Sequence, residues 1–140
     1  MTSTLIDKEQ KTQLYESTFV QIKALLSQED NKISNMANFV AVLKTSFDFF
    51  WVGFYLRESN HLMLGPFQGP VACTRIAKGK GVCGTSWSDQ KSIIVGDVRQ
   101  FPGHITCSEE SNSEIVIPLI QNGEVIGVLD IDSSEFNYFD

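Results

Sequence analysis

The chain has 140 residues, enough for a single domain with a sizeable hydrophobic core. Its net charge of −6 at pH 7 argues against a large phosphate-binding surface, so we expect no nucleic-acid partner. No apolar run is as long as a membrane-spanning helix, and the first residues lack the basic and apolar blocks of a signal peptide. We therefore expect no membrane association and a cytoplasmic location, where cysteines are normally reduced.

Two amphipathic helices are predicted in the first third of the chain. Within residues 5–28, apolar side chains such as Leu14 and Ile22 recur at helical spacing. A second stripe of the same kind predicts a helix over residues 33–46. No reactive side chain interrupts either stripe, so we interpret both as packing or dimerisation surface, and a homodimer is one expectation.

An aromatic run at residues 49–56 predicts a strand, because aromatic and β-branched side chains favour extended backbone. Alternation places Trp51, Gly53 and Tyr55 on one face, and Phe50 on the opposite face with the core residues. Two aromatic rings with polar ends, separated by a glycine, suit the wall of a small-ligand pocket. From the strand pattern alone, simple coverage of the sheet by these rings is the favoured interpretation.

The rest of the chain predicts short strands joined by loops. Strands are expected at residues 61–65, 71–76 and 92–95, and a short helix at 85–90 follows a glycine-rich loop at 77–84. That loop matches no nucleotide-binding glycine pattern. Asn122-Gly123 predicts a hairpin between runs 114–120 and 124–132, after which a short helix is expected to begin at residues 132–134. The pattern predicts one α+β domain, 1–140, with an antiparallel sheet, helices on one face and loops on the other.

Three carboxyl side chains are expected to meet on this hairpin. Asp130 and Asp132 are two residues apart in a strand, so their side chains share a face. Glu114 begins the partner strand. Like charges that pack closely raise one another's pKa, which favours a protonated carboxyl in this group. The alternative is a solvated strand end.

The three cysteines differ in their surroundings. Cys73 lies in a predicted strand, where a small buried hydrophobe is the simplest interpretation, and Cys83 lies in the glycine-rich loop. Cys107 lies in a polar loop, so we expect its thiol to be accessible and reactive. Because no Cys-x-x-Cys pair occurs, a zinc site built from the three thiolates and His104 is disfavoured, and we expect no metal.

Six stretches, which together cover most of residues 48–134 in order, carry a family resemblance. They are WVGFYL at 51–56, LGPFQGPVACTRI at 64–76, GKGVCGTSW at 79–87, DVRQFPGHITC at 97–107, SNSEIVIPLI at 111–120 and GVLDIDS at 127–133. The chain resembles the free methionine-(R)-sulfoxide reductases, which are built on a GAF domain. The resemblance implies a GAF-like antiparallel β-sheet flanked by helices, with a ligand pocket on one side. Family members usually have a longer final helix than the few residues after Ser134 allow.

The resemblance also implies a thiol-based reduction of free methionine sulfoxide without a cofactor. Cys107 takes the position of the nucleophile and Cys73 that of the cysteine that forms a disulfide with it. Cys83 takes the position of a third cysteine, for which relay toward the external reductant is one role. A thiolate is the side chain best suited to attack sulfur, and the resulting sulfenic acid condenses with a second thiol. A dithiol protein such as thioredoxin then reduces the disulfide.

The remaining matches concern the substrate. Trp51 and Tyr55 match pocket aromatics, and the resemblance implies that three carboxyl groups hold the substrate's ammonium and sulfoxide oxygen. These carboxyl groups belong to Glu114, Asp130 and Asp132. Two functions from other classes stay open, a non-catalytic GAF ligand sensor and a cysteine redox switch. A sensor usually accompanies a kinase, cyclase or DNA-binding domain, and 140 residues leave no room for one.

Overall fold

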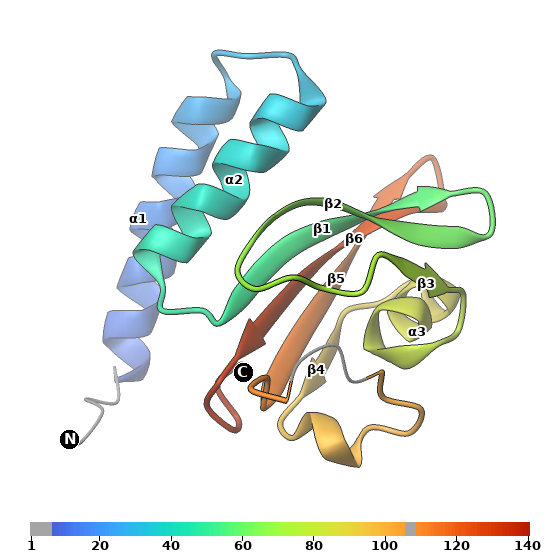
Figure 1. Cartoon of the computed structure of the whole chain (residues 1–140). Coiled ribbons are helices and arrows are strands. Elements are labelled where there is room, and N and C mark those ends of the chain that lie inside the picture. Colours follow the sequence, from blue (N-terminus) through green and yellow to red (C-terminus); the bar gives the residue numbers. More distant parts are fainter. Residues whose placement is uncertain (1–6, 106–108) are drawn as a thin grey trace.

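The computed structural model describes residues 7–105 and 109–140. Its helices and strands are α1 (Lys8–Leu26), α2 (Lys32–Ser46), β1 (Trp51–Glu58), β2 (His61–Gln68), β3 (Arg75–Ala77), α3 (Gly81–Asp89), β4 (Ile93–Val95), the 3-10 helix η1 (Val98–Gln100), β5 (Ser113–Gln121) and β6 (Glu124–Ser133). The strands form one antiparallel sheet in the order β3-β2-β1-β6-β5-β4. Figure 1 shows α1 and α2 as a helical hairpin on one face of this sheet, with α3 and long loops on the other. The predicted α+β arrangement is therefore confirmed.

The two long helices begin where side chains cap them. The Asp7 carboxylate accepts a hydrogen bond from the backbone N–H of Gln10 at 2.8 Å, and the Asn31 side chain accepts one from Ser34 at 2.9 Å. Each cap satisfies a backbone donor that the first helical turn leaves free. Both predicted helices are present, and in the described ranges no helix combines the length and the apolar character needed to cross a bilayer.

The sheet separates two hydrophobic cores. Val52 and Phe54 of β1 face α1 and α2, whereas Trp51 and Tyr55 face α3, as the alternation along the strand predicts. The prediction for Phe50 is wrong, because this residue precedes β1 and packs on the same side as Trp51. Side chains alternate between the two faces of a sheet only within a strand, so alternation could not predict the direction of the Phe50 side chain.

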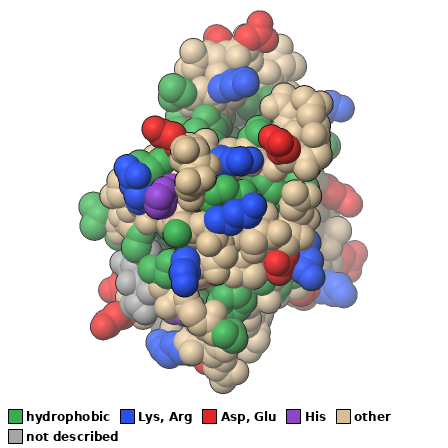
Figure 2. Space-filling model, turned by 90° about the vertical axis from the view of Figure 1, so that its right-hand side faces the viewer, with side chains coloured by type: hydrophobic (Ala, Val, Ile, Leu, Met, Phe, Trp, Pro, Cys, Tyr) green, Lys and Arg blue, Asp and Glu red, His purple; other side chains and the backbone are tan. Residues whose placement is uncertain are grey.

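Part of the surface of α1 and α2 remains apolar. Phe19 is 65% exposed, Val20 67% and Ile33 68%. Dimerisation through this surface stays a prediction. Figure 2 shows the molecule from the side of β3 and α3, where basic and acidic side chains are scattered among uncharged ones.

The middle of the chain departs most from the sequence prediction. Strand β3 begins at Arg75, so Cys73 lies in the preceding loop and not in a strand. Helix α3 begins at Gly81, so Cys83 lies in its first turn and not in a loop. The glycines signalled a loop, yet Gly84 is required for packing: a Cβ there would lie 2.5 Å from the carbonyl oxygen of Ala77. Close approach of the backbone therefore outweighs the low helix propensity of glycine.

The expected helix after residue 132 is also absent from the described segment. Strand β6 continues to Ser133, whose backbone partner is Ser113. The Ser133 hydroxyl accepts a hydrogen bond from the backbone N–H of Glu135 at 3.1 Å, and the Ser113 hydroxyl donates to the Glu135 carbonyl at 2.6 Å. The predicted capping signal thus stabilises a turn, because strand pairing extends through the first residues of the expected helix.

Candidate active site

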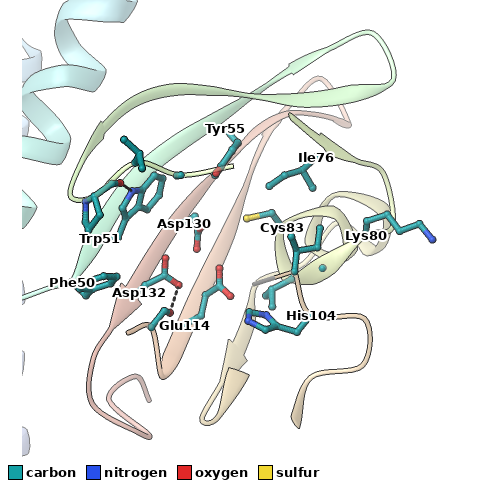
Figure 3. Close-up of a pocket in the computed structure, with 17 residues that line it drawn as sticks. Phe50, Trp51, Tyr55, Ile76, Lys80, Cys83, His104, Glu114, Asp130 and Asp132 are labelled. Atoms are coloured by element: carbon teal, nitrogen blue, oxygen red, sulfur yellow. Dashed lines mark hydrogen bonds between the residues drawn. The ribbon is translucent and has the colours of Figure 1, made fainter. Parts of the chain in front are cut away.

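A pocket opens on the side of the sheet that carries α3. Its wall comes from β1, β3, β5, β6, the first turn of α3 and adjoining loops, so residues far apart in sequence share one space (Figure 3). The lining includes six residues singled out from the sequence, Trp51, Tyr55, Cys83, Glu114, Asp130 and Asp132.

Strand register brings the aromatic and acidic side chains together. Trp51 of β1 lies opposite Asp132 of β6, and Asp132 lies opposite Glu114 of β5. Gly53 lies opposite Asp130 one row further along the sheet. Opposed residues in antiparallel strands project to the same face, so the row from Trp51 to Glu114 forms the floor of the pocket. The predicted meeting of the three carboxyl groups is confirmed.

The Trp51 indole is held in one orientation. Its Nε1–H donates to the carbonyl oxygen of Pro70 at 3.0 Å, and its ring stacks on Phe67 with 5.3 Å between ring centroids. Glycines make room for the ring, because a Cβ at Gly53 would lie 2.4 Å from Trp51 Cη2 and one at Gly69 would lie 2.7 Å from Cδ1. The glycine between the two predicted pocket aromatics is therefore a steric requirement.

Tyr55 joins the floor of the pocket to the loop before β3. Its hydroxyl donates to the carbonyl oxygen of Cys73 at 2.8 Å. Burial, reinforced by the charge of Asp130, raises the pKa of Tyr55 above its ordinary value, so the phenol stays a hydrogen-bond donor at neutral pH. The backbone of Cys73 is thereby fixed beside the pocket.

Glu114 and Asp132 sit in surroundings that favour the neutral form of their carboxyl groups. Glu114 and Asp130 are each only 6% exposed, and Asp132 is half-buried. Burial and then the charges of Asp130 and Asp132 raise the pKa of Glu114 well above its ordinary value. Burial and the charge of Asp130 do the same to the pKa of Asp132, although a 3.1 Å hydrogen bond donated by the Ser111 hydroxyl acts the other way.

Asp130 is distinguished by an unused acceptor. Burial raises its pKa, while hydrogen bonds with Glu114 and Cys83 partly offset that effect. Its Oδ1 is buried and has no hydrogen-bond partner among residues 7–105 and 109–140. A buried oxygen without a partner is costly, so this atom is suited to receive a donor or a cation from a bound molecule.

Cys83 is a free and buried thiol in this pocket, with 5% of its surface exposed. Burial, followed by the charges of Asp130, Glu114 and Asp132, raises its pKa well above the ordinary value. The neutral thiol is therefore favoured, in contrast to the thiolate that a nucleophile requires.

The remaining sequence candidates lie near the pocket or beyond the described ranges. Cys107, the predicted nucleophile, lies outside the described residues. Cys73 is half-buried in the loop whose neighbouring residue Ala72 lines the pocket. Sequence reasoning missed Phe50 and, as a pocket residue, His104, whose pKa is lowered by burial. Both lie outside regular strands, where no periodic pattern signals which way a side chain faces.

Comparison with known proteins shows the family to which this chain belongs. The GAF domain family matches residues 34–140. The Escherichia coli free methionine-R-sulfoxide reductase is 45% identical over 130 residues, which are 92% of this chain and 79% of that protein. The chain belongs to the free methionine-R-sulfoxide reductase family of GAF domain proteins.

Two further proteins are similar to this chain over most of its length. The Dictyostelium discoideum GAF domain-containing protein A is 57% identical over 136 residues, covering 96% of this chain and 86% of its own length. The X-ray structure of the Neisseria meningitidis free methionine-R-sulfoxide reductase, in complex with its substrate, matches with a TM-score of 0.93 and 47% identity. That match covers all of this chain and 85% of the other. The expected GAF fold is confirmed.

Proposed function

We propose that this protein reduces free L-methionine-(R)-sulfoxide to methionine. Its family and its likeness to a reductase solved with substrate support the proposal. The observation that carries it is the buried, unpartnered Oδ1 of Asp130, which lies in one pocket with two further carboxyl groups and the Trp51 indole. A free amino acid brings an ammonium group that can donate to this oxygen.

In the proposed complex, different side chains of the pocket bind the ammonium group, the S-methyl group and the sulfoxide oxygen of the substrate. Asp130 receives the ammonium group through a charge-assisted hydrogen bond. Trp51 packs against the S-methyl group, where sulfur–aromatic contacts are favourable. Glu114 or Asp132, whose pKa values are raised, binds the sulfoxide oxygen as a neutral acid and gives it a proton. A methionine sulfoxide residue within a protein has an amide in place of the ammonium and is expected to be a poor substrate.

The reduction itself is assigned to Cys107. Its thiolate attacks the sulfoxide sulfur, the protonated oxygen passes to the cysteine, and methionine leaves as the thioether with a Cys107 sulfenic acid as the second product. The Cys73 thiol then attacks the sulfenic sulfur, forming a disulfide and releasing water. A dithiol protein such as thioredoxin reduces this disulfide and becomes oxidised in turn.

The pairing of Cys73 with Cys107 has a direct test. Peptide mapping after one equivalent of substrate, without a reductant, is expected to show a Cys73–Cys107 linkage. A dominant Cys83–Cys107 linkage would transfer the resolving role to Cys83. Burial of the Cys83 thiol favours the first outcome, because a thiol with a raised pKa is slow to attack.

The activity is tested by NADPH consumption with thioredoxin, thioredoxin reductase and each epimer of free methionine sulfoxide. We expect sustained turnover of the R epimer and none of the S epimer, since Trp51 and the carboxyl groups bind different substituents of the sulfur. Equal rates on both epimers would contradict the proposed pocket. A ligand sensor would bind without consuming NADPH, and a redox switch would stop after one oxidation.

A further inference from the structure

Three buried side chains place atoms that could bind a metal ion close together in the pocket. The Cys83 sulfur and carboxylate oxygens of Glu114 and Asp130 all lie within 4.8 Å of one another. They come from α3, β5 and β6, and Figure 3 shows the sulfur of Cys83 directed toward the carboxyl groups. Such convergence is the arrangement that metal ligands require.

The surroundings of this cluster favour a cation. Asp130 is 94% buried, since only 6% of its surface is exposed, and its Oδ1 has no partner among the described residues. Lys80 and His104 are the basic side chains that line the described pocket. In Figure 3 the Lys80 side chain extends away from the carboxyl groups. A positive charge beside Asp130 would therefore interact with a buried carboxyl oxygen that accepts no hydrogen bond from the described residues.

We propose that Cys83, Glu114 and Asp130 bind a thiophilic divalent cation, with zinc as the representative ion. Zinc accepts cysteine sulfur at about 2.3 Å and carboxylate oxygen at about 2.0–2.2 Å in a tetrahedral arrangement. Ligand atoms around such an ion are roughly 3.3–3.6 Å apart, as these bond lengths require. The ligand atoms of these three side chains lie within 4.8 Å of one another, so small side-chain rotations bring them to that spacing.

The ligand types determine which ions this site selects. Magnesium and calcium bind oxygen ligands, so replacing one ligand by a thiol disfavours them. Zinc and related thiophilic ions accept both sulfur and oxygen. The fourth position falls to water, because the ligand atoms that lie within 4.8 Å of one another belong to Cys83, Glu114 and Asp130. The prediction of no metal rested on the spacing of the cysteines. It did not test this ligand set, which combines one cysteine with carboxylates from two strands that are distant in sequence.

The proposed site has a consequence for substrate binding. A cation at Asp130 and the ammonium group of an amino acid would occupy the same acceptor, so each would exclude the other. Zinc would then act as an inhibitor that competes with the substrate. This consequence rests on the proposed function, whereas binding of zinc in the absence of substrate does not.

The test uses the full chain with Cys73→Ser and Cys107→Ser, so that Cys83 is the remaining thiol. Zinc affinity is measured by competition with a chromophoric chelator, and cobalt(II) replaces zinc for spectroscopy. We expect one zinc per chain and a sulfur-to-cobalt charge-transfer band. Adding Cys83→Ser should remove the band, and adding Asp130→Asn should weaken zinc binding at least tenfold. Glu124→Gln, an exposed carboxylate on β6, is the matched control and should change neither result.

The outcomes separate the proposal from its alternatives. Absence of zinc binding, or equal affinity in the parent, Cys83→Ser and Asp130→Asn proteins, would overturn the site. Circular dichroism establishes that each variant is folded, and Asp130→Asn decides the question if Cys83→Ser does not fold. Saturating methionine-(R)-sulfoxide is expected to weaken zinc binding. Zinc affinity that substrate leaves unchanged would refute the competition and leave the metal-binding result to stand.

Discussion

Replacing Asp130 by asparagine tests the central contact of the proposed substrate complex. The side chain keeps nearly the same shape, so the packing around β6 is preserved, but the negative charge is lost. Asp130 is buried and its Oδ1 has no protein partner among the described residues. We therefore expect the variant to affect binding of the ammonium group more than folding.

The size of the effect follows from the type of hydrogen bond. A hydrogen bond to a charged group contributes about 1.5–3 kcal/mol, which corresponds to roughly 10- to 150-fold in affinity. Asp130→Asn should raise the substrate dissociation constant by a factor in this range. The chemical step should change less, because Glu114 and Asp132, which flank the sulfoxide oxygen in the proposed complex, remain in place.

Single-turnover release of methionine at increasing substrate concentration separates these two effects. Half-saturation reports binding, and the limiting rate reports chemistry. Glu114→Gln and Asp132→Asn are compared in the same way, and at least one of them should lower the limiting rate with little change in half-saturation. Glu124→Gln is the exposed control. Unchanged rate and affinity in all three pocket variants would refute the assignment and leave the proposed reaction without a proton source.

Three further predictions test other parts of the reasoning. Cys107→Ser should abolish turnover, because a hydroxyl is too weak a nucleophile toward sulfur, and near-normal turnover by this variant would contradict the nucleophile assignment. Cys73→Ser should release one methionine per enzyme in quenched-flow analysis and then stop. Gly53→Ala should lower the free energy of unfolding in urea by about 1–3 kcal/mol, because a Cβ would lie 2.4 Å from the Trp51 ring and 2.5 Å from the Cβ of Phe67. An unchanged midpoint would refute the steric requirement for glycine at this position. Raising the pH from 5 to 8 should lower the free energy of unfolding, because the pKa of Glu114 is raised in the folded state. This stabilisation is complete below the unfolded pKa of about 4.3 and is lost as the pH rises through the folded pKa. Glu114→Gln should reduce that slope in urea titrations, and parallel pH profiles would count against a buried carboxyl.

Several features of the site were predictable from local sequence because they depend on short-range geometry. Asn122-Gly123 formed the expected hairpin turn, with positive φ values of 52° and 80° at its two residues. The two-residue period of a strand placed Asp130 and Asp132 on one face, and the hairpin register placed Glu114 opposite Asp132. The same period separated Trp51 and Tyr55 from the residues that face the helices. Their catalytic and binding roles stay predictions.

Other features depended on how distant segments pack. Phe50 turned toward the pocket although alternation predicted the opposite face, and Cys73 proved to lie in a loop. Glycines that predicted a loop around Cys83 instead allow the backbone of α3 to pack closely against the segment before it. Local propensity could not reveal these arrangements, since each depends on a partner elsewhere in the chain.

The sequence by itself determined which chemical groups this protein carries and which of them share a strand face, because strand period and hairpin turns act over a few residues. Only the tertiary structure decided that the Cys83 thiol meets Glu114 and Asp130, and that these groups are buried. Forty-six residues separate Cys83 from Asp130 along the chain, and packing of α3 against the sheet brings them together. Burial then raises the pKa values, because removing water disfavours the charged forms, and that removal is a property of the assembled fold.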